Sequence, residues 1–141
     1  TQGSGETQQA VISSAVDVGV AIGTLGAIGA YSKGAPIRII GAQSTGAGDL
    51  YWYAKPESGI TSIAGNAGKT IAYSTNGSST QTVVKAFTEE LGTKATPTAT
   101  GSPTATLTQV MSGQVDIGWS APPAWARITG SGQDQEAGDR Q

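Results

Sequence analysis

One short pattern occurs twice in this chain and constrains its fold more than any other feature. The stretches "VISSAVDVGVA" at 11–21 and "VMSGQVDIGWS" at 110–120 share a helix-like run, a Ser-containing turn and the order Val-Asp-hydrophobic-Gly. A short β-branched run bounded by glycine is typical of a buried parallel strand. Because 141 residues ordinarily form one core, the repeat predicts two related but fragmentary α/β units. The alternative is that this pattern is a common way to begin a buried strand.

The rest of the chain alternates helical and strand patterns, so the predicted fold class is α/β. We expect helices at 5–15, 24–34, 79–91 and 104–113, and strands at 16–21, 37–43, 49–55, 70–74, 94–99 and 115–119. A Pro- and Gly-containing stretch interrupts this alternation in the middle of the chain. The predicted organisation is a first unit at 1–54, a connector at 55–69, a second unit at 70–123 and a tail at 124–141.

Composition excludes several classes of chemistry. The chain has no Cys and no His, which excludes disulfides, a thiolate zinc site, a Cys nucleophile and a histidine base. The net charge is −2, and the eight Lys and Arg residues are scattered along the chain, so they form no basic stripe that could bind nucleic acid. We expect no cofactor and no metal. The longest apolar run, which begins at Val16, is too short and too rich in Gly to span a bilayer, and the first residues do not resemble a signal peptide.

Polar residues between the strand at 70–74 and the helix at 79–91 form one candidate binding site. Free backbone N–H groups and the helix dipole favour an anion at such a position. The side chains that would add hydrogen bonds are Asn76, Ser78, Ser79 and Thr80. The alternative is that Ser78 or Ser79 only caps the helix. The segment is not a Walker loop, because no Gly-Lys-Ser/Thr ends it.

The first unit and the end of the second repeat supply further candidates. Thr24, Ser44 and Thr45 follow predicted strands of the first unit, although simple turn chemistry also suits the loop at 42–49. Trp119 and Ser120 end the second Val-Asp strand, where an indole could wall a cleft or pack within the core. Asp17 and Asp116 start their strands, so we expect them to accept backbone N–H bonds at the preceding turn and to have no catalytic role.

Three stretches carry a resemblance to a known family: "SGETQQAVISSAVDVGVAIGTLGAIGAYSKGAPIRIIGAQ", "GKTIAYSTNGSSTQTVVKAFTEELG" and "LTQVMSGQVDIGWSAPP". Over residues 3–123 the chain resembles the substrate-binding proteins of ABC importers in the nitrate/sulfonate/taurine group, called NMT1-like. The resemblance implies a periplasmic-binding-protein type II-like fold with two Rossmann-like lobes around a cleft. It also implies a periplasmic, non-enzymatic protein that delivers a small anionic solute, such as a sulfonate, nitrate or a short carboxylate, to a membrane permease.

The departures from this family lead to further expectations. Family members are longer, so we expect a truncated fragment with two incomplete lobes. The tail at 124–141 is either an ordinary disordered acidic segment or the product of a frameshift. Incomplete lobes would expose apolar strands, which predicts a homo-oligomer. One alternative is a self-associating structural fragment without a ligand. Another is a thiamine-pyrimidine synthase-like enzyme, whose chemistry the resemblance links to an active-site His that is absent here.

Overall fold

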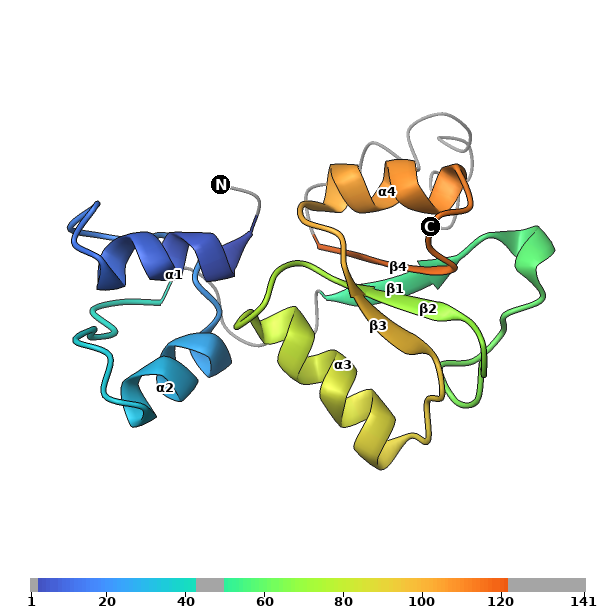
Figure 1. The fold of residues 1–141 in the computed structure, drawn as a ribbon, viewed down its shortest axis with the longest axis horizontal. Coiled ribbons are helices and arrows are strands. Elements are labelled where there is room, and N and C mark those ends of the chain that lie inside the picture. Colours follow the sequence, from blue (N-terminus) through green and yellow to red (C-terminus); the bar gives the residue numbers. More distant parts are fainter. Residues whose placement is uncertain (1–2, 43–49, 122–141) are drawn as a thin grey trace, which may run out of the picture.

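The structure is a computed structural model that describes residues 3–42 and 50–121. Helices and one mixed four-stranded sheet give it an α/β architecture (Figure 1). The helices are α1 (Ser4–Ile12), α2 (Thr24–Ser32), α3 (Ser79–Glu90) and α4 (Pro103–Met111), and a 3-10 helix spans Pro56–Ser58. The strands are β1 (Tyr51–Ala54), β2 (Thr70–Tyr73), β3 (Thr96–Ala99) and β4 (Ile117–Ser120).

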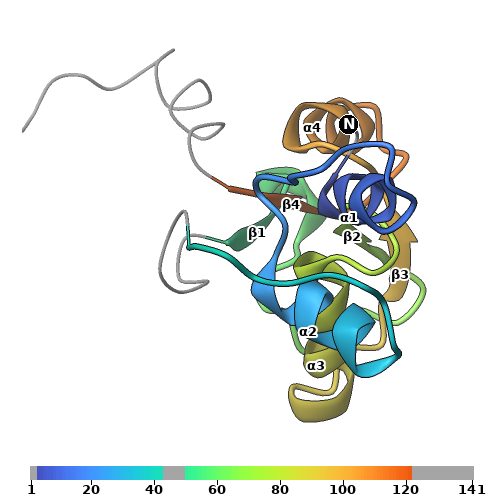
Figure 2. The ribbon, with the colours of Figure 1, turned by 90° about the vertical axis from the view of Figure 1, so that its left-hand side faces the viewer.

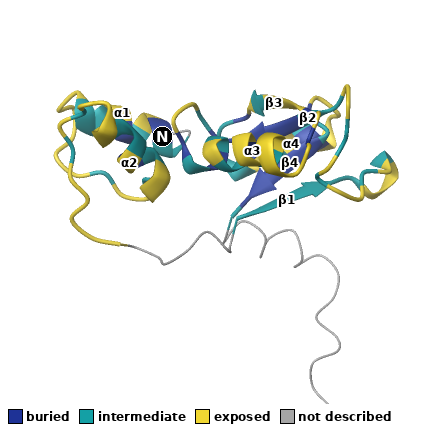
Figure 3. Cartoon of the chain, turned by 90° about the horizontal axis from the view of Figure 1, so that it is seen from below, coloured by how far each residue is buried: buried dark blue, intermediate teal, exposed yellow. Residues whose placement is uncertain are grey.

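The sheet is built from residues after Leu50 and has the order β1-β4-β2-β3. β2 runs parallel to β3 and β4, whereas β1 pairs antiparallel with β4 at one edge. The connecting helices α3 and α4 cover opposite faces of the sheet, as Figure 1 shows. Val84 of α3 belongs to a core cluster with Ile71, and Val110 of α4 to a second cluster with Ala72. Most of the buried residues in Figure 3 therefore lie in and around this sheet.

The helices that follow the parallel strands begin where sequence patterns predict. Ser78 caps α3 by accepting a hydrogen bond from the backbone N–H of Gln81 at 3.2 Å. Ser102 caps α4 in the same way, accepting from Ala105 at 3.2 Å, and Pro103 occupies the first turn. Both caps satisfy N–H groups that have no partner inside the helix. Because both helices follow parallel strands, their N-termini lie at the carboxyl edge of the sheet.

Helices α1 and α2 stand at one end of the molecule, beside the loop between β2 and α3 (Figures 1 and 2). The backbone N–H of Gly5 donates to Thr75 Oγ1 at 3.1 Å. A Cβ placed on Gly26 of α2 would lie 2.5 Å from the carbonyl oxygen of Gly77. Glycine is therefore needed at position 26 for α2 to approach the backbone of this loop.

Two predicted strands of the first unit are absent from the structure. The segments at 16–21 and 37–42 lie outside any strand, and position 43 of the second prediction is outside the described residues. Val18 is 61% exposed and Ile40 is 82% exposed, although the prediction placed this part of the chain in a buried sheet. A parallel strand forms only with hydrogen-bonded neighbours. Within the described residues neither segment has such a neighbour, which explains why the hydrophobic pattern was misleading here.

The repeat is nevertheless reproduced in the two turns that end α1 and α4. The backbone N–H groups of residues 15 and 16 both donate to the carbonyl of Ala10, and those of residues 114 and 115 both donate to Gln109. Ser14 and Gly113 hold equivalent positions with positive φ angles of 58° and 77°. This is the usual left-handed end of a helix. The predicted order of helix, turn and strand is thus confirmed for the second copy, and for the first copy only through the turn.

Candidate functional site

Three buried hydroxyl residues end the three parallel strands. Ser74 and Thr100 follow the paired ends of β2 and β3, and Ser120 is the last residue of β4. Their exposed fractions are 4%, 5% and 2%. Ser74 and Thr100 were not among the predicted site residues. Ser74 is the last residue of the strand predicted at 70–74, and Thr100 directly follows the strand predicted at 94–99. This position at the strand ends is the signal that could have found them, because ligands of open α/β sheets bind beyond the carboxyl ends of strands.

The loop between β2 and α3 contains a network of hydroxyl groups centred on Thr80. Thr80 Oγ1 accepts from the backbone N–H of Ser74 at 2.9 Å and lies 2.8 Å from Ser74 Oγ. Ser78 Oγ is 2.9 Å from the same atom. A hydroxyl offers one donor and two acceptor positions, so these three contacts occupy Thr80 fully. Thr80 therefore holds the loop together, and Ser78 is the helix cap that the sequence analysis gave as an alternative.

Ser79 differs from its neighbours because its hydroxyl is buried and has no hydrogen-bond partner among the residues that the structure describes. A Cβ placed on Gly23, the residue before α2, would collide with Ser79 Oγ. The first residue of α3 therefore faces the first turn of α2. A buried polar group without a partner is uncommon in folded proteins and calls for an explanation. Because Gly23 lies directly against this hydroxyl, a ligand atom could accept the hydrogen bond of Ser79 only if the first turns of α2 and α3 moved apart.

All four helices begin around this loop. Gly5 in the first turn of α1 binds Thr75, and α2 begins beside Ser79. The backbone N–H of Gly101, just before α4, donates to the carbonyl of Ser74 at 2.9 Å. The first turns of α2, α3 and α4 contain no acidic residue, whereas α1 has Glu6. The partial positive charges of several helix N-termini thus meet with little acidic compensation, which favours an anion.

The remaining predicted site residues have different surroundings. Thr24 is exposed at the start of α2, close to the same loop. Asn76 is exposed, and its Oδ1 accepts from Tyr73 at 2.8 Å and from Gln81 at 3.0 Å. Ser44 and Thr45 lie outside the described residues.

Trp119 is 7% exposed and packs in the core cluster that contains Val110, as the packing alternative predicted. Its indole Nε1 has no hydrogen-bond partner among the described residues. Its antiparallel neighbour Trp52 instead donates to the carbonyl of Ala72 at 2.8 Å and meets Phe87 edge to face. Trp119 therefore combines a packing role with a free donor next to Ser120.

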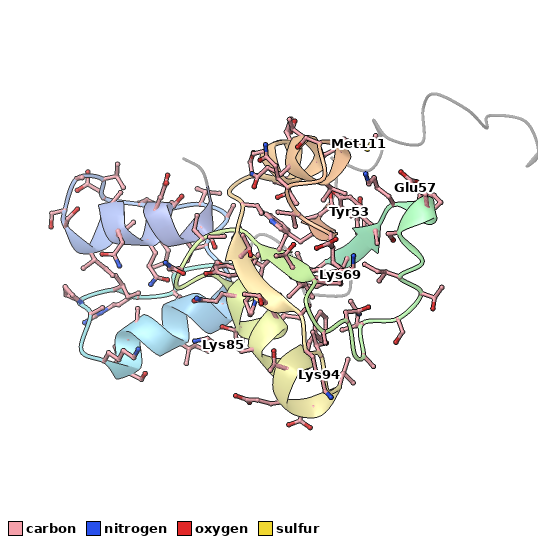
Figure 4. All side chains as sticks on the ribbon, turned by 45° about the vertical axis from the view of Figure 1, so that its right-hand side comes forward. Tyr53, Glu57, Lys69, Lys85, Lys94 and Met111 are labelled. Atoms are coloured by element: carbon pink, nitrogen blue, oxygen red, sulfur yellow. The ribbon has the colours of Figure 1, made fainter. Side chains whose placement is uncertain are left out.

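The β1 tyrosines add two buried hydroxyl groups that the sequence analysis did not assign to the site. Tyr51 and Tyr53 lie on one side of β1 with ring centroids 6.4 Å apart, and neither hydroxyl has a described partner. Burial, together with the neighbouring Tyr51, raises the pKa of Tyr53 to about 12. Tyr53 is therefore a neutral donor at physiological pH. Figure 4 labels it between the sheet and the C-terminal end of α4.

Asp116 has the structural role that we predicted, but with a different partner. Its carboxylate accepts from the backbone N–H and hydroxyl of Thr70 at 2.9 and 3.0 Å, and Lys69 lies 3.4 Å away. We expected a bond to the turn preceding its own strand, whereas the bond goes to the start of the neighbouring strand β2. The equivalent Asp17 is exposed and has no described partner.

Comparison with known proteins assigns the chain to a family. A family model described as NMT1/THI5 like matches residues 1–138, so the chain belongs to this family. No curated protein and no solved structure matches it. Membership of the NMT1/THI5-like family supports a general role of the chain in solute binding and transport, although the family also includes synthases. Binding proteins of this family are usually extracellular or periplasmic.

None of the helices in the described part of the chain is long and apolar enough to cross a membrane. That part of the chain also contains no cluster of three or more acidic, His or Cys side chains arranged to hold a metal ion. The polar groups that the described residues bring to this site are backbone N–H groups, hydroxyls and the Trp119 indole.

Proposed function

We propose that this chain binds a small anionic solute at the carboxyl edge of its parallel strands and serves an ABC permease outside the cytoplasmic membrane. The observation that carries the proposal is the buried Ser79 Oγ, which has no partner within the described ranges and lies between the N-termini of α2 and α3. Family membership supports the general function of solute binding. Helix N-termini and hydroxyl donors are the groups that bind oxyanions in proteins that lack a cationic side chain at the site.

The solute that suits this donor set is a sulfonate, nitrate, taurine or a short carboxylate. Each has several oxygen acceptors that N–H and O–H donors can satisfy together. Ser79, Thr24 and Ser120 would face the oxygens, and the Trp119 indole would meet an organic tail or donate from Nε1. Ser44 and Thr45 would complete the site from the loop at 42–49.

We propose that the site lies between two lobes. Residues 1–54 would form a partial first lobe, 55–69 the connector and 70–123 a partial second lobe, with 124–141 as a tail outside both. The placement of α1 and α2 against the loop at 74–79 supports this arrangement, because it brings donors from both parts of the chain together. β1 belongs to the sheet of the second part through its pairing with β4, so it would act as a strand that crosses between lobes.

We also propose that the chain is not an enzyme and that it self-associates. The absence of histidine argues against a synthase of the kind found in this family. The exposed apolar residues between 16 and 40 favour self-association, since soluble monomers rarely expose so many large hydrophobic side chains.

The binding proposal is tested by titrating methanesulfonate, nitrate and acetate into the wild type and into Ser79→Ala by calorimetry. We expect one of these anions to bind, and Ser79→Ala to weaken it about tenfold, as expected for a lost hydrogen bond to a charged group. Ser32→Ala is the matched control, because Ser32 Oγ donates only to Gly29 at 3.0 Å at the far end of α2. Absence of heat for every anion, or equal affinity in Ser79→Ala, would contradict the proposal.

A further inference from the structure

The loop between β2 and α3 contains an Asn-Gly pair whose own chemistry the anion site does not use. Asn76 and Gly77 are both exposed, and Gly77 has a positive φ of 80°. A Cβ placed on Gly77 would have nothing within 4 Å, so no neighbour crowds this turn. Because glycine has no side chain, its backbone nitrogen can approach the side-chain amide of the preceding asparagine more easily than that of any other residue.

Two donors hold the side-chain carbonyl of Asn76. The Tyr73 hydroxyl donates to Asn76 Oδ1 at 2.8 Å, and Gln81 Nε2 donates to the same atom at 3.0 Å. Gln81 Oε1 accepts from the backbone N–H of Gly77 at 2.8 Å, which fixes the end of the Gln81 amide that faces Asn76. Asn76 Nδ2 has no hydrogen-bond partner among the described residues. The carbonyl of this amide is therefore polarised, while its nitrogen is free to leave.

We propose that Asn76-Gly77 is a site of self-modification, at which Asn76 is converted to an aspartate or an isoaspartate. The Gly77 nitrogen gives its proton to water and bonds to Asn76 Cγ. Nδ2 takes up a proton from water and leaves as ammonia, which closes a cyclic imide. A water molecule then opens the imide at either carbonyl. The net reaction consumes one water and releases one ammonia, so it needs no cofactor and no other reactant.

The two donors assist the step in which the imide forms. Negative charge develops on Oδ1 when the Gly77 nitrogen attacks Cγ. The Tyr73 hydroxyl and Gln81 Nε2 already point at that atom, so they stabilise the charge as it forms. Tyr73 is well fixed for this role, because its side chain is 9% exposed and belongs to the core cluster of Ile71.

The other asparagine of the chain, Asn66, has the opposite arrangement. It is followed by Ala67, whose side chain hinders the approach of the backbone nitrogen. Its Nδ2 donates to the carbonyl of Ser62 at 2.8 Å, so a hydrogen bond must break before this nitrogen can leave. Asn66 therefore serves as an internal control for the modification of Asn76.

The product places a carboxylate where helix N-termini meet. A Cβ placed on Gly5 would collide with the carbonyl oxygen of Asn76, and one on Gly26 would lie 2.5 Å from that of Gly77. The loop thus contacts the first turns of α1 and α2 and leads into α3. A carboxylate attached here is attracted by the same partial charges as a free anion and competes with it. This effect on binding rests on the proposed function, whereas the modification itself does not.

The modification is measured on the full chain, incubated at pH 8 and mapped at intervals by mass spectrometry of its peptides, which detects conversion of amide to acid at each asparagine. A synthetic peptide of residues 72–81 is the unfolded reference. Tyr73→Phe removes the hydroxyl and keeps the ring, in the full chain and in the peptide. Tyr31→Phe, on a ring of α2 that is 68% exposed, is the matched control.

We expect Asn76 to convert at least as fast in the folded chain as in the peptide, while Asn66 stays unmodified over the same time. Tyr73→Phe should slow the conversion in the folded chain about fivefold, as expected for one lost hydrogen bond, and should have no effect in the peptide. Tyr31→Phe should convert like the wild type. Protection of Asn76 by folding, or equal rates in Tyr73→Phe and the wild type, would overturn the proposal.

Asn76→Asp reports the effect of the product on the anion site, because it adds the charge and keeps an acceptor for Tyr73 and Gln81. We expect methanesulfonate to bind this variant several-fold more weakly than the wild type in calorimetry. Equal affinity would overturn the effect on binding. Absence of binding to the wild type would overturn both this effect and the proposed function, but not the conversion of Asn76, which is read from the masses.

Discussion

At the scale of single residues, two aspartates at equivalent positions of the repeat are held differently. Burial raises the pKa of Asp116, but hydrogen bonds from Thr70 and Lys69 outweigh it and lower the pKa below its usual value. These bonds tie the start of β4 to the start of β2. Asp17 has no such partner among the described residues. The same sequence motif is therefore a strand anchor in one copy and an exposed carboxylate in the other.

The pair provides a matched test of this difference. Asp116→Asn should lower the free energy of unfolding at pH 7 by about 1 kcal/mol, because charge-assisted hydrogen bonds to the backbone and hydroxyl of Thr70 are weakened. Asp17→Asn should have almost no effect. Urea denaturation monitored by tryptophan fluorescence measures both. Equal effects of the two substitutions would show that the bonds of Asp116 do not stabilise the sheet.

The sign of the pH dependence follows from the lowered pKa. A carboxylate with a lower pKa in the folded state stabilises that state above its unfolded pKa of about 3.9. This stabilisation is lost as the pH falls through the folded value. Between pH 6 and pH 3 the wild type should therefore lose more stability than Asp116→Asn.

At the scale of helices and strands, the sequence predicted the elements that depend on local signals. The N-caps Ser78 and Ser102 and the amphipathic run of α3 are local, and both helices begin where expected. The segment at 16–21 has equally clear strand character, but a strand depends on a neighbour that local sequence does not reveal. β1 was predicted as a strand, yet its antiparallel pairing with β4 was not.

The candidate site was also predictable only in part, because local sequence marks some of its residues but not the contacts between them. The loop residues Ser78, Ser79 and Thr80 were found because they lie between a strand and a helix. Their separate roles were not predictable, because the network around Thr80 includes Ser74 through side-chain geometry. Thr100 was recognised as a residue of the candidate site only from the register of β2 and β3, which places it beside Ser74.

Two glycines of α2 test how this helix docks on the loop. Gly26→Ala should destabilise the protein, because the new Cβ would lie 2.5 Å from the backbone oxygen of Gly77. Gly29→Ala, one turn later, has nothing within 4 Å of its Cβ and should stabilise the helix by about 0.5–1 kcal/mol. Thermal unfolding distinguishes the two. If Gly26→Ala is as stable as Gly29→Ala, α2 does not rest on this loop.

At the scale of the whole molecule, anion binding by an acidic protein needs a local cause. The net charge of −2 would repel an anion at long range. The N-termini of the four helices oppose this effect because they meet around one loop, where the hydroxyls of three strand ends also gather. Surface lysines offer a competing, non-specific way to attract an anion: Lys94 lies beyond the C-terminal end of α3, far from that loop in Figure 4, whereas Lys85 lies in the second turn of α3.

The most direct test locates the anion by following backbone amide resonances during a titration with methanesulfonate. We expect the largest shifts at residues 77–80 and 23–25, with smaller shifts at 101 and 102, just before α4 begins. We expect little change around Lys85 and Lys94. Shifts confined to those lysines, or no shifts at all, would contradict the claim that the helix N-termini of this protein form an anion site.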